Sequence, residues 1–366
     1  MDLQKAFDII DHEILLCKLY RYGVRGSVYE WFKSYLSDRC QFVYVNCTCS
    51  ELGDVKCGVP QGSILGPLLF LLYVNDIQNC VPSIPIKLYA DDTNVFIHGN
   101  NIDAITLDAE DCIHNLNKWF VANKLSLSID KTCFSTFGVP DCEKKNIVLK
   151  INNMNLKQVE STKYLGVIID INLNWAEHID YIYKKIIKFT SIFYKIRDNI
   201  PDEVKKMVYF AFIHSNLNYG IEIYANTYNS YLNKLMILNN KILRILQSAP
   251  RYAHVKDLYS KYNTLTIPNL HKYNILLFVH KFFHHPYQLP DIFVSYFTIN
   301  SEYHGYCTRS KGDPHLELFT SSLGQRSLKY KGPRLWCSLP DQLKAISSTQ
   351  SFKHKFKIYL LNHQDV

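Results

Sequence analysis

Two kinds of hydrophobic pattern alternate along the first part of the chain. Apolar residues recur at helical spacing in four segments, 11–22, 27–37, 63–79 and 101–124. Runs typical of β-strands cover 41–57, 86–90, 93–98, 125–137 and the strand pair at 147–170. Segments of both kinds in alternation predict an α/β or α+β domain in which helices pack on a sheet.

Local signals refine two of these elements. Ser27 and Glu30 have the spacing of a capping box, which predicts that the second helix begins at Ser27. The two strand-like runs after residue 85 meet at Asp91 and Asp92. We therefore expect a β-hairpin with two carboxylates at its turn.

The pattern changes near Asn174, where long helical segments with interleaved Lys and Tyr begin. The clearest of these segments are 175–197, 230–247, 268–284 and the basic amphipathic run 351–361. We place a domain boundary at 171–175 and a weaker one at Pro286–Pro290, and we expect loops in the polar segment 300–332. The chain is thereby divided into 1–172, 173–285 and 286–366.

Composition and charge narrow the class of protein. Of the 366 residues, 47% are hydrophobic and 20% are charged, which is typical of a globular rather than a disordered chain. The net charge of +8 favours a polyanionic partner if the basic residues share one face. The 26 Tyr residues suit base stacking, but core packing is the more common use of any single Tyr.

The cysteines and the apolar runs exclude several classes. The 11 cysteines have neither metal-site nor disulfide-framework spacing, so we interpret them as reduced thiols. The polar start of the chain has no signal-peptide pattern, and the longest apolar run, Ile64 to Val74, is too short to span a bilayer. We expect an intracellular protein of the cytoplasm and nucleus.

Three short segments carry the candidate chemistry. An isolated Asp-Asp pair is most often a solvated turn, but YADD (89–92) follows DLQKAFD (2–8) and GVPQGSILGP (58–67) along the chain. Adjacent carboxylates repel one another unless a cation lies beside them, and Mg²⁺ prefers oxygen ligands. Phosphoryl transfer to a 3′-hydroxyl uses two such ions, which aspartates on adjacent strands can hold.

In order and spacing these segments resemble motifs A, B and C of reverse transcriptases, and their amino-acid sequences resemble those of the non-LTR (LINE-type) retrotransposon group. The resemblance implies an α+β polymerase palm, an antiparallel sheet with packed helices, followed by an all-α thumb and C-terminal region. It implies an RNA-directed DNA polymerase that uses an RNA template, a DNA primer and dNTPs. Asp2, Asp91 and Asp92 would bind two Mg²⁺ ions, or Mn²⁺ in their place, with the Leu3 carbonyl as a further ligand.

The same resemblance assigns roles to other residues. Phe7 would exclude a 2′-hydroxyl from the incoming sugar, although without the motif a buried core Phe is the more common case. Gln61, Gly62 and Tyr89 would bind the substrate, nucleotide or template, and we interpret Asp8 and His12 as structural. We interpret Gly58, Gly62 and Gly66 as allowing the backbone to approach a nucleotide. NKLSLSIDKT (123–132) resembles motif D, in which Lys131 would contact pyrophosphate, unless it is an ordinary solvated lysine.

Later segments extend the resemblance. KYLGVIID (163–170) resembles motif E, the primer grip, with Tyr164, Leu165 and Gly166 as its core. A thumb helix needs cations along one face to follow phosphates. The candidates are Lys184, Lys185, Lys188, Lys195 and Arg197. HGYCTRS (304–310) and YKGPRLWCSLP (330–340) resemble the tail of non-LTR polymerases, with Cys337 where Asn is expected.

The fingers region that precedes motif A in this family has no counterpart before Asp2. We therefore expect a truncated polymerase that is weak or inactive alone, with Asp2 loosely held at a frayed end. A non-enzymatic nucleic-acid-binding remnant of a retrotransposon is the alternative. A folded remnant without activity is a third possibility.

Overall fold

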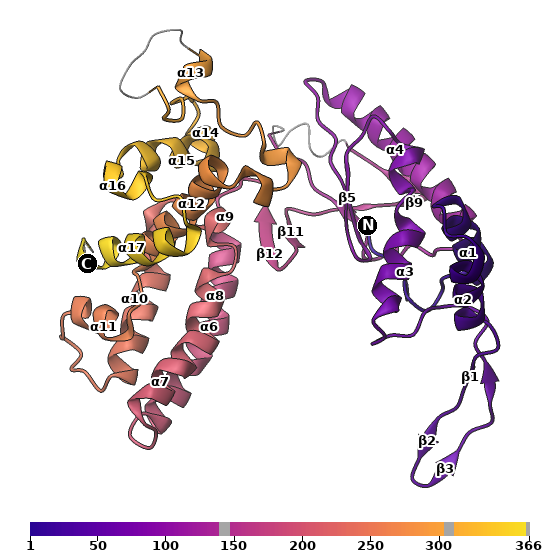
Figure 1. The fold of residues 1–366 in the computed structure, drawn as a ribbon, viewed down its shortest axis with the longest axis horizontal. Helices are drawn as coiled ribbons and strands as arrows, with labels where there is room; N and C mark the ends of the chain where they lie inside the picture. The colour runs from indigo at the N-terminus through magenta and orange to yellow at the C-terminus, as the bar shows by residue number, and fades with distance from the viewer. Residues whose placement is uncertain (139–146, 304–310, 364–366) are drawn as a thin grey trace. The chain divides into compact units, whose positions relative to one another are not determined.

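The computed structural model describes residues 1–138, 147–303 and 311–363, and it divides into two compact units, Met1–Glu160 and Ser161–Val366. Unit 1 combines helices with short β ladders, and unit 2 is mainly helical (Figure 1). Helices and small, largely antiparallel ladders make a mixed fold compatible with α+β. The tail segment HGYCTRS (304–310) lies outside the described residues.

Unit 1 contains the predicted helices, three of them shortened and the second with its expected length but one residue earlier. They are α1 (His12–Arg21), α2 (Gly26–Leu36), α3 (Leu65–Val74), the 3₁₀ turn η1 (Ile77–Cys80) and α4 (Ile102–Ala122). The Asp11 side chain caps α1 by accepting a hydrogen bond from the Ile14 amide at 3.0 Å. The capping-box prediction for α2 is wrong, because that helix begins at Gly26 and its N-cap, Arg25, makes no side-chain cap. Ser27 already lies inside the helix, where its hydroxyl cannot act as the N-cap.

The strands of unit 1 are short, and among its described residues they form two-stranded ladders. They are β1 (Cys40–Gln41), β2 (Tyr44–Val45), β3 (Thr48–Cys49), β4 (Gly53–Asp54), β5 (Ile86–Tyr89), β6 (Asp92–Val95), β7 (Cys133–Phe134), β8 (Lys150–Ile151), β9 (Met154–Asn155) and β10 (Lys157–Gln158). The pairs β1–β4, β2–β3, β5–β6 and β8–β9 are antiparallel, and β7–β10 is parallel. The strand expected at 125–137 is reduced to β7, because the chain turns at 128–132, where the Thr132 hydroxyl and amide both bond the Ser128 carbonyl.

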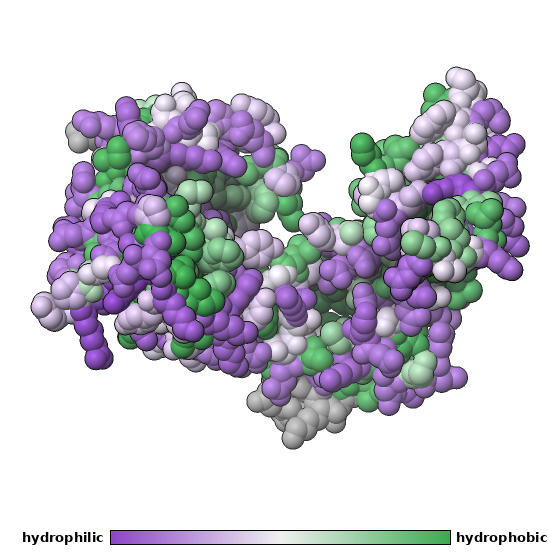
Figure 2. Space-filling view, turned by 90° about the horizontal axis from the view of Figure 1, so that it is seen from below, coloured by the Kyte–Doolittle hydropathy of each residue, from purple (hydrophilic) through white to green (hydrophobic). Residues whose placement is uncertain are grey.

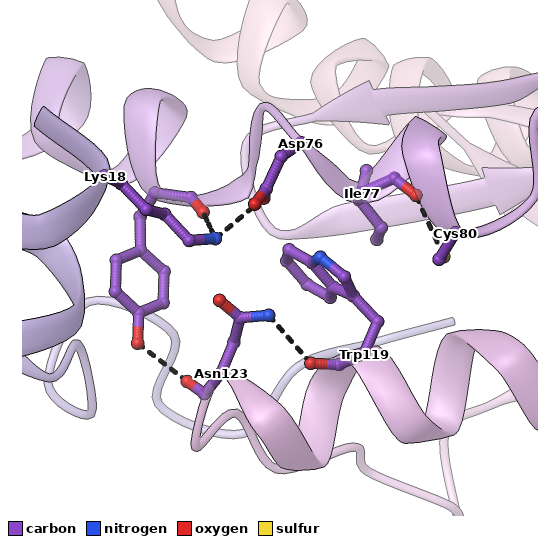
Figure 3. Close-up of polar contacts among 7 residues, drawn as sticks. Lys18, Asp76, Ile77, Cys80, Trp119 and Asn123 are labelled. Atoms are coloured by element: carbon purple, nitrogen blue, oxygen red, sulfur yellow. Dashed lines mark hydrogen bonds and ion pairs between the residues drawn. The ribbon is translucent and has the colours of Figure 1, made fainter. Parts of the chain in front are cut away.

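The main core of unit 1 joins α1, α3 and α4 around a buried lysine. The Lys18 ammonium donates to the Tyr73 carbonyl at 2.6 Å and to the Asp76 carboxylate at 2.7 Å (Figure 3). It also lies 4.8 Å from the centre of the Trp119 ring, and burial lowers the pKa of Lys18. The Tyr73 hydroxyl donates to the Asn123 carbonyl at 2.7 Å. This network fixes the end of α4, from which the chain continues toward residues 125–132.

Unit 2 consists of one hairpin followed by helices. The hairpin is β11 (Ser161–Tyr164) and β12 (Val167–Asp170). The helices are α6 (Ala176–Ile196), α7 (Asp202–Val208), the π-helix η2 (Tyr209–His214), α8 (Ser215–Asn218), α9 (Ile221–Tyr224), α10 (Asn229–Leu246), α11 (Val255–Tyr262), α12 (Ile267–His284), η3 (Pro286–Gln288), η4 (Asp291–Phe293), α13 (Asn300–Tyr303), α14 (Ser322–Arg326), α15 (Leu328–Cys337), α16 (Asp341–Lys344) and α17 (Thr349–Asn362). The predicted long helices correspond to α6, α10, α12 and α17.

The C-terminal segment belongs to the core of unit 2. One hydrophobic cluster extends from Val167 to Leu360. Within it Trp336 of α15 stacks on Phe283 of α12, with ring centroids 5.2 Å apart. A Cβ at Gly332 would come within 2.9 Å of the Phe297 ring, so the glycine allows α15 to pack closely. Within the expected loop region 300–332, α13, α14 and the start of α15 are helical, because α15 buries an apolar face on α12.

Apolar side chains also remain at the surface of both units, among charged ones (Figure 2). Examples are Trp31, Phe42, Tyr44 and Leu52 in unit 1 and Tyr252, Tyr287 and Leu318 in unit 2. In the described parts of the chain, no helix combines the length and the apolar character needed to cross a membrane.

Candidate active site

The hairpin predicted around Asp91 and Asp92 is present. Strands β5 and β6 pair from Ile86 with Val95 to Tyr89 with Asp92, leaving a two-residue turn of Ala90 and Asp91. Ala90 has a φ of 50°, in the left-handed region that two-residue hairpins require and that glycine adopts more readily. The tight turn therefore holds both carboxylates at one end of the hairpin.

The segment that carries Asp2 is hydrogen-bonded on both sides. On one side the Met1 nitrogen donates to the Thr93 carbonyl at 2.8 Å, and the Thr93 amide donates to the Met1 carbonyl at 3.2 Å. On the other side the Ser128 amide donates to the Asp2 carbonyl at 2.9 Å, and Leu3 forms an antiparallel bridge with Leu127. The expectation of a loosely held Asp2 is wrong, because these bonds tie its backbone to β6 and to the chain after α4.

The three carboxylates are electrostatically coupled. Asp92 is exposed, but partial desolvation raises the pKa of its carboxyl, and the negative charges of Asp91 and Asp2 raise it further. The Lys131 ammonium lies 3.1 Å from a carboxylate oxygen of Asp2 and forms an ion pair with it. Crowded negative charge of this kind is what a bound cation relieves.

The donor set suits a hard cation, but the side chains do not form a closed cage. Mg²⁺ takes carboxylate oxygens and retains water or phosphate ligands, so a few aspartates suffice. Within residues 1–138, 147–303 and 311–363, no three His, Cys, Asp or Glu side chains are grouped closely enough to hold a metal ion. The Asp2 carboxylate is instead paired with Lys131.

The residues expected at the nucleotide lie on neighbouring segments. The half-buried Phe7 ring packs against Phe70 of α3 with centroids 4.8 Å apart, and the Phe7 carbonyl accepts a hydrogen bond from the Val59 amide at 2.8 Å. Gln61 is exposed, and its side-chain amide donates to the Asp8 carboxylate at 2.9 Å. The DLQKAFD and GVPQGS segments are thus connected directly, and Asp8 joins them.

The glycines of GVPQGSILGP have different roles. A Cβ at Gly58 would lie 2.7 Å from the Asp8 carbonyl oxygen, and one at Gly66 would lie 2.7 Å from the Pro60 carbonyl oxygen. Close packing against protein backbone is therefore sufficient to explain glycine at these two positions, and their approach to a nucleotide stays a prediction. Gly62 has a φ of 82° and open space where a Cβ would lie. His12, expected to be structural, bonds the Gly58 carbonyl at 2.8 Å.

The expected primer-grip residues form the turn of the hairpin β11–β12 in unit 2. Leu165 and Gly166 are the two turn residues, with φ of 45° and 84°. The Tyr219 hydroxyl donates to the Leu165 carbonyl at 2.5 Å. Tyr164 pairs with Val167 and is half-buried.

Sequence reasoning missed three contributors to these sites. Ser128 and Thr132 shape the turn that carries Lys131, and Tyr219 lies far along the chain from the hairpin that it contacts. Thr132 was a usable signal, because a threonine hydroxyl commonly bonds the backbone carbonyl four residues earlier, here that of Ser128. Nothing in the sequence around Tyr219 links it to Leu165.

Comparison with known proteins assigns this arrangement to a class. Residues 1–169 match the family model described as reverse transcriptase (RNA-dependent DNA polymerase). These residues are therefore similar to the reverse transcriptase family, whose members generally use divalent metal ions and act on a nucleic-acid template and primer.

The similar proteins place the domain among the non-LTR retrotransposon, LINE-type, enzymes. Over 268 residues the chain is 28% identical to the RNA-directed DNA polymerase from mobile element jockey of Drosophila melanogaster. The aligned stretch covers 70% of this chain and 29% of that protein. Over 279 residues the chain is 25% identical to the probable RNA-directed DNA polymerase from transposon BS of the same species, covering 73% of this chain and 30% of that protein. The chain thus spans less than a third of the length of these relatives.

Proposed function

We propose that residues 1–172 form the palm of an RNA-directed DNA polymerase that extends a DNA primer on an RNA template. The observation that carries the proposal is the pairing of the Asp2 segment with β6 next to Asp92, within residues that match the reverse transcriptase family. Two segments that are 92 residues apart in sequence are thereby joined by direct hydrogen bonds. The raised pKa of Asp92 supports a site made for cations.

Each residue at this site has a proposed role. Asp2, Asp91 and Asp92 would hold two Mg²⁺ ions, or Mn²⁺ in their place, with the Leu3 carbonyl as a further ligand. Bound metal would lower the pKa of the primer 3′-hydroxyl and take up charge on the leaving pyrophosphate. The protein groups would position the dNTP for in-line attack. These groups are Phe7 against the sugar, Gln61 and Gly62 against nucleotide or template, Tyr89 beside the carboxylates, and Lys131 toward the pyrophosphate.

The rest of the chain would hold the nucleic acid. We propose a thumb at 173–285 and a C-terminal region at 286–366, with Tyr164, Leu165 and Gly166 gripping the primer end. Cations on α6 would follow the phosphate backbone, among them Lys184, Lys185, Lys188, Lys195 and Arg197. The enzyme would act inside the cell, in the cytoplasm and nucleus.

The test replaces one carboxylate oxygen donor. Asp92→Asn should reduce dNTP addition to a DNA primer annealed to RNA by about a hundredfold or more, since metal-ion catalysis is worth several kcal/mol. Asp108→Asn, on the exposed face of α4, is the matched control and should leave addition unchanged. We expect weak synthesis by residues 1–366 alone, so single-nucleotide addition of a labelled dNTP is the measurement. Addition that survives Asp92→Asn would refute the proposed catalytic role.

A nucleic-acid-binding remnant is the second candidate, and an exposed basic surface in unit 2 favours it. The Lys163 ammonium lies 5.2 Å from the Tyr181 ring centre and the Lys185 ammonium lies 6.0 Å from it, next to the hairpin β11–β12. This candidate predicts salt-sensitive RNA binding, measured by fluorescence anisotropy, that Asp92→Asn does not change, together with no dNTP addition by either protein. A folded remnant without activity predicts neither binding nor addition.

A further inference from the structure

The side chain of Lys131 contacts the carboxylate that the proposed function assigns to metal. We propose that Lys131 is the resident counter-ion of Asp2, which it neutralises until a divalent cation displaces it, and that displacement frees the ammonium for the substrate phosphates. The inference rests on the proposed function of Asp2, Asp91 and Asp92. It adds a coupling between metal binding and the position of Lys131.

The backbone around Lys131 fixes it beside Asp2. The Ser128 amide donates to the Asp2 carbonyl at 2.9 Å, so this point of the chain is attached directly to the segment that carries the carboxylate. A tight turn follows, in which the Lys131 and Thr132 amides donate to the Ser128 carbonyl at 3.2 and 2.9 Å. The buried Thr132 hydroxyl donates to the same carbonyl at 2.8 Å. Lys131 therefore begins from a fixed point close to Asp2.

The side chain, by contrast, is largely exposed to solvent. Its exposed fraction is 73%, compared with 24% for the Asp2 side chain. An exposed lysine–carboxylate pair contributes little net free energy, since solvent screens it and the long side chain loses entropy. A divalent cation carries twice the charge of the ammonium, so it interacts more strongly with Asp2 and with the nearby negative charge of Asp92. The exposed ion pair is therefore weak enough for such a cation to displace.

The ion pair between Lys131 and Asp2 explains why Asp2, Asp91 and Asp92 influence one another electrostatically but are not grouped as metal ligands in the described residues. While Lys131 neutralises Asp2, that carboxylate remains with the ammonium. Divalent cation binding requires Asp2 to exchange one positive partner for another. The freed Lys131, anchored on its turn, stays within reach of a group bound at the same carboxylates.

Metal affinity measured without nucleic acid tests the proposal. Mn²⁺ is titrated into the full chain and free Mn²⁺ is followed by electron paramagnetic resonance. Lys131→Gln should bind Mn²⁺ about threefold more tightly or better, because the competing charge is gone. Lys131→Arg keeps that charge and should bind like the unaltered chain. Lys124→Gln is the matched control, because Lys124 is also exposed and pairs with an aspartate, Asp11 at 2.5 Å, that is outside the proposed site.

A merely structural lysine would give a different pattern. Its loss should weaken Mn²⁺ binding and dNTP addition together, whereas the proposed exchange predicts tighter Mn²⁺ binding with slower addition. Labelling with an acetylating reagent gives a second readout by mass spectrometry. Adding Mn²⁺ should increase acetylation of Lys131 and leave that of Lys124 unchanged.

The outcomes separate this inference from the function on which it rests. Mn²⁺ binding that Asp92→Asn removes and Lys131→Gln leaves unchanged or weakens would overturn the exchange while supporting the metal site. Absence of Mn²⁺ binding by the unaltered chain would overturn both. Tighter binding by Lys131→Gln together with Mn²⁺-dependent acetylation of Lys131 would establish the exchange.

Discussion

Two hairpins of equal length, one in each unit, differ in how their ends are held. In both, two four-residue strands are joined by a two-residue turn. The turn of β5–β6 is Ala90 and Asp91, and that of β11–β12 is Leu165 and Gly166. The first presents crowded carboxylates at a strained turn, and the second is fixed by neighbouring side chains. Both turns contain a non-glycine residue at positive φ, Ala90 at 50° and Leu165 at 45°, so the crowded carboxylates, and not the backbone conformation alone, distinguish the hairpin with the proposed chemistry.

The aspartates of the two hairpins illustrate the difference. Asp170, at the end of β12, is buried and accepts hydrogen bonds from the amides of Asn172, Asn174 and Trp175 at 2.7 to 3.2 Å. In the described residues of unit 1, no donor is hydrogen-bonded to the side chain of Asp91 or Asp92, and the pKa of Asp92 is raised. The aspartate carboxylate in the second hairpin is thus occupied by structural hydrogen bonds, whereas the two aspartate carboxylates in the first hairpin remain available to a ligand.

The largest difference between the two hairpins should be the effect of acidic pH on their stability. His178 of α6 accepts a hydrogen bond at Nδ1 from the Ile168 amide of β12 at 3.2 Å, so its Nε2 carries the proton. Burial lowers the pKa of His178 to about 4 from 6.5. As the pH falls, the unfolded chain takes up this proton before the folded chain does. The contribution of His178 to the free energy of unfolding is therefore fully present above pH 6.5 and falls by about 3 kcal/mol as the pH falls toward 4. Asp92 contributes with the opposite sign. Its pKa is raised, so the folded chain takes up this proton before the unfolded chain does, and protonation relieves repulsion in the folded state.

Hydrogen exchange followed by mass spectrometry, corrected for intrinsic rates, measures this contrast. Between pH 7 and pH 4.5 protection of the peptide covering 161–170 should fall, while that of the peptide covering 86–95 should not. His178→Gln, which retains an acceptor for the Ile168 amide but cannot titrate, should remove most of the loss. Equal loss of protection in both hairpins would show that acid acts globally. His98→Gln, at an exposed position after β6, is the control.

Exchanging the turn residues should give effects of opposite sign. Gly166 has a φ of 84°, and an added Cβ would lie 3.1 Å from the Tyr219 ring, so Gly166→Ala should destabilise unit 2 by about 2 kcal/mol. Ala90 has a φ of 50°, so Ala90→Gly should relieve strain and stabilise unit 1 by about 0.5 kcal/mol after the entropy cost of glycine.

Urea unfolding with tryptophan fluorescence measures both changes, because Trp31 and Trp119 report on unit 1 and Trp175 and Trp336 on unit 2. If Ala90→Gly destabilised unit 1 as much as Gly166→Ala destabilises unit 2, the turn at Ala90 would not be strained. Gly23→Ala is a control for a positive-φ glycine with open space around it, and it should show the backbone cost without a steric one.

The comparison also explains what the sequence could predict. Both hairpins and most helices follow from local pattern, since periodicity and turn residues lie within a few positions of each other. The order of DLQKAFD, GVPQGSILGP and YADD predicted a reverse transcriptase, and the match of residues 1–169 to that family model confirms the prediction. The ion pair between Lys131 and Asp2 and the contact of Tyr219 with Leu165 join residues far apart in sequence. Such contacts depend on tertiary packing, which no local signal near Asp2 or Tyr219 records.

The smallest effect should come from the bond that closes the second turn. The Tyr219 hydroxyl donates to the Leu165 carbonyl at 2.5 Å across 54 residues of sequence. Because Tyr219 is 57% exposed, water can replace this bond, and Tyr219→Phe should cost only about 0.5 to 1 kcal/mol. The retained ring still limits the space beside Gly166, so Gly166→Ala should remain destabilising in the Phe variant and become milder in a Tyr219→Ala background.

Urea unfolding of the single and double variants gives the coupling energy between the two positions. Tyr252→Phe, at a 90% exposed position of the same unit, should change nothing. Additive costs for Gly166→Ala and Tyr219→Ala would mean that the ring does not hold the turn, and the second hairpin would then be no better fixed than the first. A positive coupling confined to this pair would mean that tertiary contacts hold the second turn, in contrast to the turn that carries the carboxylates.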